Sequence, residues 1–344
     1  MTNAKHNSVR TPFVRLAKRS SIGAVRAWCI RVVAVLLALV INALLIYTIT
    51  KMNPLQVYVS MFKGAFGSTR RIWNFIREGC MLLCISVALA PAFKMRFWNI
   101  GAEGQVLAGG IATAACMIYL GGKIPTPLLF LVMILASVAA GALWGFIPAL
   151  FKAKWGTNET LFTLMMNYIA IQITSYCVAL WENPYGSNKV GIINPQTKAG
   201  WFPKLFGQQY TWNVLIVLAL TVLVFLYLKY SKQGYEVAVV GESQDTARYA
   251  RINVKRTIIR TMGISGGICG IAGFLLVSGA SHTISTSTAG GRGFTAIIVA
   301  WLSKFNAFVM ILVSFFLVFM GKGAIQIASQ FNLNENASDV ITGI

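Results

Sequence analysis

Acidic residues and histidines are scarce in this chain of 344 residues, which contains nine Asp and Glu and two His. Charged residues of both signs make up only 11% of the chain, whereas a soluble domain carries about 25%. Acid–base catalysis and metal binding both need such groups in clusters, and the sequence seldom places two of them close together. The composition therefore indicates no catalytic residues and no metal site, and it is typical of a membrane protein.

A nucleotide-binding motif is also missing, because the sequence contains no phosphate loop of the form G-x-x-x-x-G-K-[ST]. A G-x-S-x-G match occurs at Gly263–Gly267, but it lies inside an apolar run of small residues and not at the strand-to-helix turn that a nucleophile elbow needs. We therefore expect no cofactor in this chain and predict that it is not an enzyme. If ATP drives its function, the ATP is bound by another chain.

Cysteine does not supply a disulfide framework or a metal site. Most of the six cysteines lie inside apolar runs, and Cys80 and Cys84, one helical turn apart, have no neighbouring His or acid. We interpret them as small buried hydrophobic residues. The six are Cys29, Cys80, Cys84, Cys116, Cys177 and Cys269.

Long apolar runs are abundant instead, and hydrophobic residues make up 56% of the chain. Most runs reach the roughly 20 residues that a helix needs to cross a bilayer. A shorter run at 294–303 predicts a half-helix buried among the others. We predict an all-α fold, a polytopic membrane helical bundle of about nine to ten transmembrane segments, the last beginning near Asp339. The expected segments are 30–50, 76–93, 99–120, 127–150, 160–181, 211–230, 257–280, 294–303 and 305–321.

The net charge of +21 follows the connections between the apolar runs, which argues against nucleic-acid binding. Residues 1–29 are basic and contain no acid, and the run that follows is too long for a signal peptide. We expect residues 1–29 to be a cytoplasmic N-terminal segment, followed by a transmembrane domain at 30–344. This threading also places 94–98, 151–159 and 229–260 in the cytoplasm.

Polar residues begin the segment at 99–120, where Asn99, Glu103 and Gln105 follow one another. Asn99 and Glu103 would share one face of a helix that starts at Asn99. Charge at membrane depth is costly, so these side chains are candidates for lining a substrate path. The alternative is a helix start whose dipole favours the acid.

The segment at 160–181 carries a second polar group. Asn158 can cap this helix, and Glu159 then lies favourably in its first turn, which is the structural interpretation of both residues. Asn167 lies two turns further along, where an amide needs a partner from the protein or from a substrate. We therefore include Asn158, Glu159 and Asn167 among the path candidates.

Two further patterns concern packing and docking. Gly141-x-x-x-Gly145 and the overlapping glycine pairs of 263–270 predict close helix packing. The polar, amphipathic stretch at 231–256 is too long for a turn, so it is either a docking site for a cytosolic partner or a solvated loop.

Four ordered stretches resemble the permeases of ATP-binding-cassette (ABC) importers of the branched-chain amino acid, ribose and nucleoside group. They are FWNIGAEGQ at Phe97–Gln105, GTNETLFTLMMNY at Gly156–Tyr168, the stretch Gly234–Ile252, and GRGFTAIIVA at Gly291–Ala300. The second is most similar to the nucleoside branch, and simple-sugar and riboflavin permeases share much of the pattern. The resemblance extends from about residue 30 to residue 330.

The resemblance implies a permease domain at 30–344 that imports nucleosides by alternating access in the plasma membrane of a bacterium. The partners that it implies are a second permease, expected to be a different chain, cytosolic ATPase subunits that use ATP and Mg²⁺, and an external substrate-binding protein. The segment 231–256 would couple ATPase closure to the bundle. Its expected contacts are Gly241, Glu242, Ala247, Tyr249 and Arg251.

The sequence departs from the family pattern in two places. Arg251 stands where the coupling segment usually has Gly, and Trp301-Leu-Ser-Lys304 replaces a Leu-Leu-Gly stretch. A secondary transporter coupled to protons or sodium is the alternative from another class. That class predicts paired broken helices in two repeats, whereas this sequence has one short segment without a clear counterpart. A membrane enzyme would need clustered catalytic side chains, which the sequence lacks.

Overall fold

The computed structural model describes residues 53–331 apart from residue 206, together with isolated positions between 26 and 48. Within that part of the chain the secondary structure is α-helical, with one turn of π-helix and no β-strand, so the all-α prediction is confirmed. The helices are α2 (Pro54–Phe66), α3 (Thr69–Lys94), α4 (Ala102–Leu120), α5 (Thr126–Trp155), α6 (Glu159–Leu180), α7 (Thr211–Tyr230), α8 (Lys232–Glu242), α9 (Gln244–Tyr249), α10 (Val254–Leu276, continued by the π-helical turn Val277–Ser281), α11 (Arg292–Leu302) and α12 (Ala307–Phe331).

Seven of the described helices are long and apolar enough to cross a bilayer: α3, α4, α5, α6, α7, α10 with its π-helical turn, and α12. The predicted short segment is also present, as α11 of 11 residues. The predicted run at 30–50 falls mostly on residues outside the described part, and the one expected from Asp339 lies wholly outside it. The count of nine to ten segments therefore stays a prediction.

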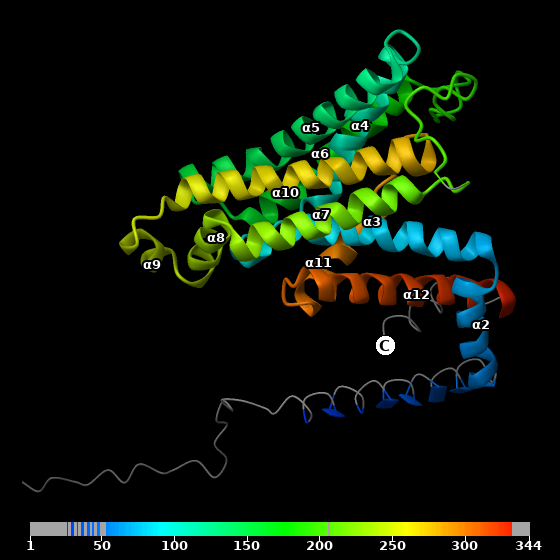
Figure 1. Cartoon of the computed structure of the whole chain (residues 1–344), viewed down its shortest axis with the longest axis horizontal. Helices are drawn as coiled ribbons and strands as arrows, with labels where there is room; N and C mark the ends of the chain where they lie inside the picture. Colours follow the sequence, from blue (N-terminus) through cyan, green and yellow to red (C-terminus); the bar gives the residue numbers. More distant parts are fainter. Residues whose placement is uncertain are drawn as a thin grey trace, which may run out of the picture.

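The seven long helices run roughly side by side (Figure 1). Helices α8 and α9 lie together at one end of this bundle, and α2 crosses the opposite end steeply against α12. The sequence interpretation missed α2, because Gln56, Ser60 and Lys63 interrupt its 13 residues and prevent a long apolar run. Its start is nevertheless coded locally, since Asn53 Oδ1 accepts from the backbone N–H of Leu55 and Pro54 follows.

Helices α3 and α10 form the centre of the bundle and are buried along most of their length, whereas α5, α6, α7 and α12 are peripheral. Helix α10 packs against α3, α4 and α5. The glycines permit this packing: a Cβ on Gly270 would overlap the Ser137 carbonyl, and one on Gly141 would overlap the Gly266 carbonyl. Gly141, Gly145, Gly266 and Gly270 are thus packing positions, as predicted, whereas Gly263 faces open space.

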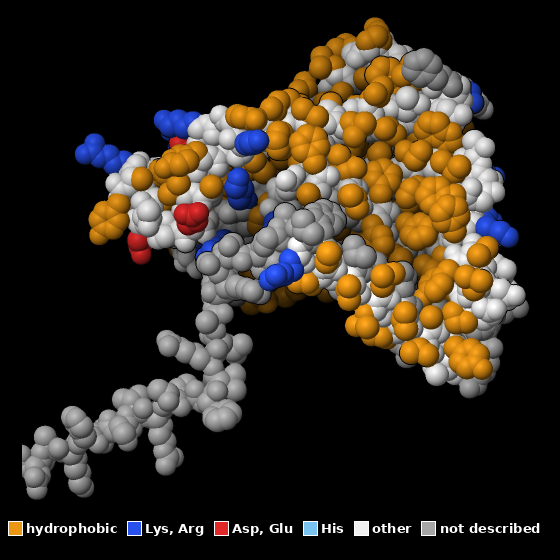
Figure 2. Space-filling model, turned by 60° about the horizontal axis from the view of Figure 1, so that its bottom comes forward, with side chains coloured by type: hydrophobic (Ala, Val, Ile, Leu, Met, Phe, Trp, Pro, Cys, Tyr) orange, Lys and Arg blue, Asp and Glu red, His pale blue; other side chains and the backbone are white. Residues whose placement is uncertain are grey.

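Figure 2 shows a surface that is divided along the length of the bundle. Hydrophobic side chains cover the body, and most of the charged side chains in this view gather at the end formed by α8 and α9. An apolar belt on the outside of seven parallel helices is the surface expected for a bundle in lipid. The chain is therefore a multi-pass membrane protein. The exposed basic residues at the α8–α9 end are Arg96, Lys154, Lys229, Lys232, Arg248, Arg251, Lys255 and Arg256.

Candidate functional site

Glu103 holds the start of the half-helix α11. Its Oε1 accepts from the backbone N–H of Gly291 at 2.7 Å, and its Oε2 accepts from that of Gly293 at 2.8 Å. The first N–H groups of a helix have no partner within the helix and carry partial positive charge, so a carboxylate there satisfies both hydrogen bonding and charge. Glu103, from α4, thereby fixes a helix that lies almost 190 residues later in the chain.

Asn99 does not share a helical face with Glu103, so that prediction is wrong. Helix α4 begins at Ala102, because Asn99 Oδ1 accepts from the Gly101 N–H at 3.0 Å and closes a turn in front of the helix. The Asn99 amide also exchanges two hydrogen bonds of 3.3 Å with the Gln105 amide. Asn99 and Gln105 are buried, and each amide serves as the other's partner.

Asn167 finds its partner in the protein. Its Oδ1 accepts from the Gly104 N–H at 2.8 Å, and its Nδ2 donates to the Ile100 carbonyl at 2.9 Å. The side chain therefore joins α6 to the backbone of the turn that precedes α4 and of its first residues. Glu103, Asn99, Gln105 and Asn167 thus form one buried polar framework around the start of α4.

Asn158 and Glu159 lie at the start of α6 and do not join this framework. Asn158 Oδ1 caps α6 by accepting from the N–H groups of Thr160 and Leu161. Glu159 forms an ion pair with Lys152 at 2.7 Å, which ties α6 to the last turn of α5. Their contacts are those of a helix start, although their role in a substrate path remains a proposal.

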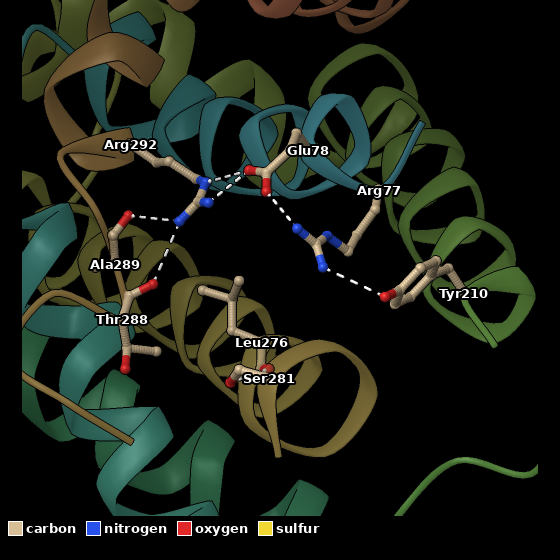
Figure 3. A network of polar contacts seen from close by, with 8 residues as sticks. All are labelled: Arg77, Glu78, Tyr210, Leu276, Ser281, Thr288, Ala289 and Arg292. Carbon is tan, nitrogen blue, oxygen red and sulfur yellow. Dashed lines mark hydrogen bonds and ion pairs between the residues drawn. The ribbon is translucent and has the colours of Figure 1, made fainter. Parts of the chain in front are cut away.

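An ionic network that the sequence interpretation missed lies between α3, α11 and the segment before α7 (Figure 3). Arg292 and Arg77 approach Glu78 from two sides: Arg292 donates through Nε at 3.1 Å and through Nη2, and Arg77 donates through Nη2 at 2.7 Å. Arg77 Nη1 also donates to the Tyr210 hydroxyl at 3.4 Å. Arg292 Nη1 donates back to the carbonyls of Thr288 and Ala289, so the guanidinium also braces the segment that leads into α11.

The network borders a cavity of about 310 Å³, which is lined by Glu78, Arg292 and Thr295 and by residues of α12. Adjacent Arg77 and Glu78 at the beginning of the apolar run 76–93 were a visible signal in the sequence. Arg292 was visible too, but it lies 214 residues from Glu78, and no spacing rule connects them.

The predicted coupling segment folds as α8, α9 and the start of α10. Two of its five predicted contact residues are buried: Ala247 is fully covered, and Gly241 lies so close to the Lys94 carbonyl that a Cβ would overlap it. Gly241 and Ala247 therefore hold the segment against the bundle in this conformation. The other three, Glu242, Tyr249 and Arg251, are exposed.

Arg251 adopts a left-handed backbone conformation, with φ at 58°. The Ile252 N–H donates to the Ala247 carbonyl and the Arg251 N–H donates to the Arg248 carbonyl, which closes the end of α9. Glycine is the usual residue in this conformation because it has no Cβ to clash with the backbone. The position where the family usually has Gly is thus one that requires a positive φ.

His282 contacts the segment between α6 and α7 at the end of the bundle opposite α8 and α9. Its ring stacks on Trp201 with 3.9 Å between ring centroids, and its Nε2 lies 2.8 Å from Gln209 Nε2. Its Nδ1 is buried and has no hydrogen-bond partner among the described residues. Burial lowers the pKa of His282 below its ordinary value of 6.5.

Comparison with known proteins gives three informative relatives. The chain is 28% identical over 319 residues to the guanosine ABC transporter permease protein NupP of Bacillus subtilis, covering 91% of this chain and 90% of NupP. It is 29% identical over 260 residues to the nucleoside ABC transporter permease protein NupB of Lactococcus lactis, covering 73% and 71%. It is 26% identical over 328 residues to the glucose ABC transporter permease protein TsgB13 of Haloferax volcanii, covering 92% and 85%.

A family model covers most of the chain, and its range includes every element of the site. The model is that of the permease component of the branched-chain amino acid transport system, and it matches residues 71–344. The matched range contains Glu78, Glu103, Asn167, Arg292 and the whole coupling segment. The chain belongs to this family and is a permease component of an ABC importer.

Proposed function

We propose that this permease imports nucleosides. The observation that carries the proposal is the similarity to a guanosine permease, which extends over nine-tenths of both chains. The second relative, a nucleoside permease, supports the same substrate class. A simple sugar is the second candidate, because a glucose permease is similar over a comparable share of the chain. Riboflavin stays an alternative from the sequence pattern.

The working transporter contains more than this chain. We propose that it pairs with a second, different permease, that cytosolic ATPase subunits supply the energy with ATP and Mg²⁺, and that an external binding protein delivers the substrate. The α8–α9 end and residues 1–29 would face the cytoplasm of a bacterial cell. The exposed trio Glu242, Tyr249 and Arg251 would then meet the ATPase.

The substrate path is proposed to follow the buried polar framework. Asn99, Glu103, Gln105 and Asn167 bond to one another or to nearby backbone groups here, so a path along them requires a second arrangement of the bundle. Alternating access provides it, as two arrangements biased by ATP and by the binding protein. Asn158 and Glu159 would lie at its cytoplasmic end.

The test is uptake by the complete transporter in membrane vesicles supplied with ATP. Labelled guanosine and uridine should accumulate, and unlabelled nucleosides should compete while glucose and riboflavin should not. Accumulation of glucose alone would replace the substrate assignment with a sugar. Uptake that persists without ATPase subunits but collapses with the ion gradient would indicate an ion-coupled transporter.

The coupling assignment has its own test. Arg251→Glu reverses an exposed charge at the α8–α9 end and should lower ATPase co-purification and transport-stimulated ATP hydrolysis several-fold. Arg70→Glu, at the exposed start of α3 and the opposite end of the bundle, is the matched control and should leave both unchanged. Equal ATPase stimulation in the two variants would contradict the coupling role.

A further inference from the structure

The exposed face of α6 differs from those of the other peripheral helices. Between Leu128 and Phe146 every exposed residue of α5 is apolar, and the same holds between Leu215 and Leu226 of α7. Helix α6 instead exposes a glutamine and two tyrosines within its central turns. These residues, with the serine beside them, are Tyr168, Gln172, Ser175 and Tyr176.

The polar residues share one side of α6. Tyr168, Gln172 and Tyr176 follow at intervals of four, and such residues lie above one another on a helix. The side that packs into the bundle carries other residues, among them Thr163, Asn167 and Thr174. The polar stripe therefore points away from α4.

Gln172 lies near the middle of the helix. It comes thirteen residues after Glu159 in a helix of 22 residues, which at about 1.5 Å per residue is about 20 Å from the start. The amide has no hydrogen-bond partner among the described residues, and Tyr168 is 59% and Tyr176 70% exposed. An unpartnered amide at this depth is unfavourable against lipid, because hydrocarbon offers no hydrogen bonds. The stripe is therefore a surface that meets water, a ligand or another protein.

A groove runs along this stripe. Its volume is about 450 Å³, and it is lined by Tyr168, Ile169, Gln172, Ile173 and Tyr176. Small-molecule sites commonly enclose roughly 300–1,000 Å³ and combine apolar walls with a few polar groups. This groove differs from such a site, because it is open and its surface is almost wholly apolar, so it offers a shallow apolar bed along α6 beside the amide and the two phenols.

We propose that Tyr168, Gln172 and Tyr176 contact the nucleobase during transport and that Gln172 is a specificity-determining residue. This inference rests on the proposed nucleoside substrate. The glutamine amide offers one acceptor and two donors, which can pair with the ring nitrogens and exocyclic groups of a base. Aromatic rings stack on the faces of bases with little regard to their identity. Tyr168 and Tyr176 thus supply affinity, and Gln172 between them supplies selection.

The spacing of the three residues along α6 limits which of them one base can contact. Residues one turn apart on a helix are about 6 Å apart at Cβ, so a single base can contact Gln172 together with one of the two tyrosines. Tyr168 and Tyr176 lie two turns apart, about 12 Å, which exceeds the width of one base. The two rings therefore mark successive positions along the exposed side of α6, with the amide shared between them.

Uptake by the complete transporter tests the assignment. Gln172→Leu should raise the KM for labelled guanosine about tenfold or more and leave the maximal rate within about twofold. Gln172→Glu, which removes the amide donors, should change the ratio of guanosine to uridine uptake. Tyr168→Ala should raise KM while Tyr168→Phe should not, because stacking needs the ring and not the hydroxyl. Leu218→Ala, at an exposed apolar position of α7 outside the groove, is the matched control and should change KM by less than twofold.

A labelling experiment provides a readout that does not depend on turnover. Gln172→Cys should react with a hydrophilic maleimide, above the labelling of the unsubstituted chain, and guanosine should slow the reaction several-fold. Labelling without protection overturns the contact, as does an unchanged KM in Gln172→Leu. Loss of the second permease from purified Gln172→Leu transporter with an unchanged KM would make the stripe a subunit interface instead. If the unsubstituted transporter takes up no nucleoside, the proposed function and this inference fall together, whereas nucleoside uptake with an insensitive Gln172 overturns the inference alone.

Discussion

Two carboxylates, the half-buried Glu78 and the buried Glu103, hold the start of α11 by different means. Glu78 binds two guanidinium groups, from Arg77 and Arg292, so its environment is made of whole charges. Glu103 binds the backbone N–H groups of Gly291 and Gly293, so its environment is made of peptide dipoles. Removing one partner of an ion pair leaves an uncompensated charge, whereas removing a carboxylate from a helix start leaves only neutral N–H groups. The difference predicts unequal costs for similar mutations.

The largest effect is expected for Glu78→Ala. Two arginines would lose their counter-charge at a half-buried site, so the loss should lie at or below the about 3–5 kcal/mol that breaking a fully buried pair costs. Thermal unfolding of the purified chain in detergent, followed by tryptophan fluorescence, would measure the loss. Glu78→Gln should recover part of it through hydrogen bonding alone. A Glu78→Ala variant as stable as the original chain would mean that the arginines find other partners or water.

Glu103→Ala should cost less, because it leaves no charge uncompensated: each of the two N–H groups that lose their acceptor costs about 1–3 kcal/mol only where no water replaces the carboxylate. The same unfolding measurement applies, and the stability of Glu103→Gln should lie between those of the original chain and Glu103→Ala. Reversal of the order, with Glu103→Ala more damaging than Glu78→Ala, would show that the helix dipole outweighs the ionic network at this site.

Arg251→Gly should increase stability by about 1 kcal/mol. A residue with a Cβ pays about 1–2 kcal/mol in the left-handed conformation, and the greater freedom of glycine in the unfolded chain offsets part of the gain. Arg251→Ala keeps the Cβ and removes the same charge, so it is the control that should show no gain. An equal gain in both variants would assign the effect to charge and not to the backbone.

The smallest effect concerns pH. Because burial lowers the pKa of His282 below 6.5, the unfolded chain binds this proton at a higher pH than the folded chain does. His282 therefore contributes stability above pH 6.5 that is lost as the pH falls below that value. Thermal unfolding between pH 7.5 and 5 should show a loss that His282→Phe, which keeps a ring for stacking on Trp201, reduces. An identical pH dependence in both proteins would move the effect to other groups.

Much of the fold was predictable because it is coded by residues close together in the chain. The spans begin at local signals such as Asn158 and Asn253, which cap α6 and α10, and run through apolar stretches of bilayer length. The glycines of α5 and α10 predicted which surfaces pack closely. Helix α2 escaped because an amphipathic helix of 13 residues has too short an apolar run for a length criterion.

The site was less predictable because its contacts join distant positions. Glu103 and Asn167 were recognised as unusual, but their partners are backbone groups, which carry no sequence signature. The error at Asn99 came from one local choice, since its amide closes a turn instead of continuing a helix. Glu78 and Arg292 are identifiable only once α3 and α11 are placed side by side.

The two anchors of α11 also bear on how this half-helix can be exchanged between relatives. Glu103 binds only backbone N–H groups, so it can bind a transplanted segment of any sequence that keeps a glycine at position 293, where a Cβ would overlap Glu103. Glu78 binds the guanidinium of Arg292, so it can hold only a segment that has an arginine at position 292. A chimera that exchanges α11 alone would keep one anchor and lose the other, and a viable exchange unit therefore includes α3 together with α11.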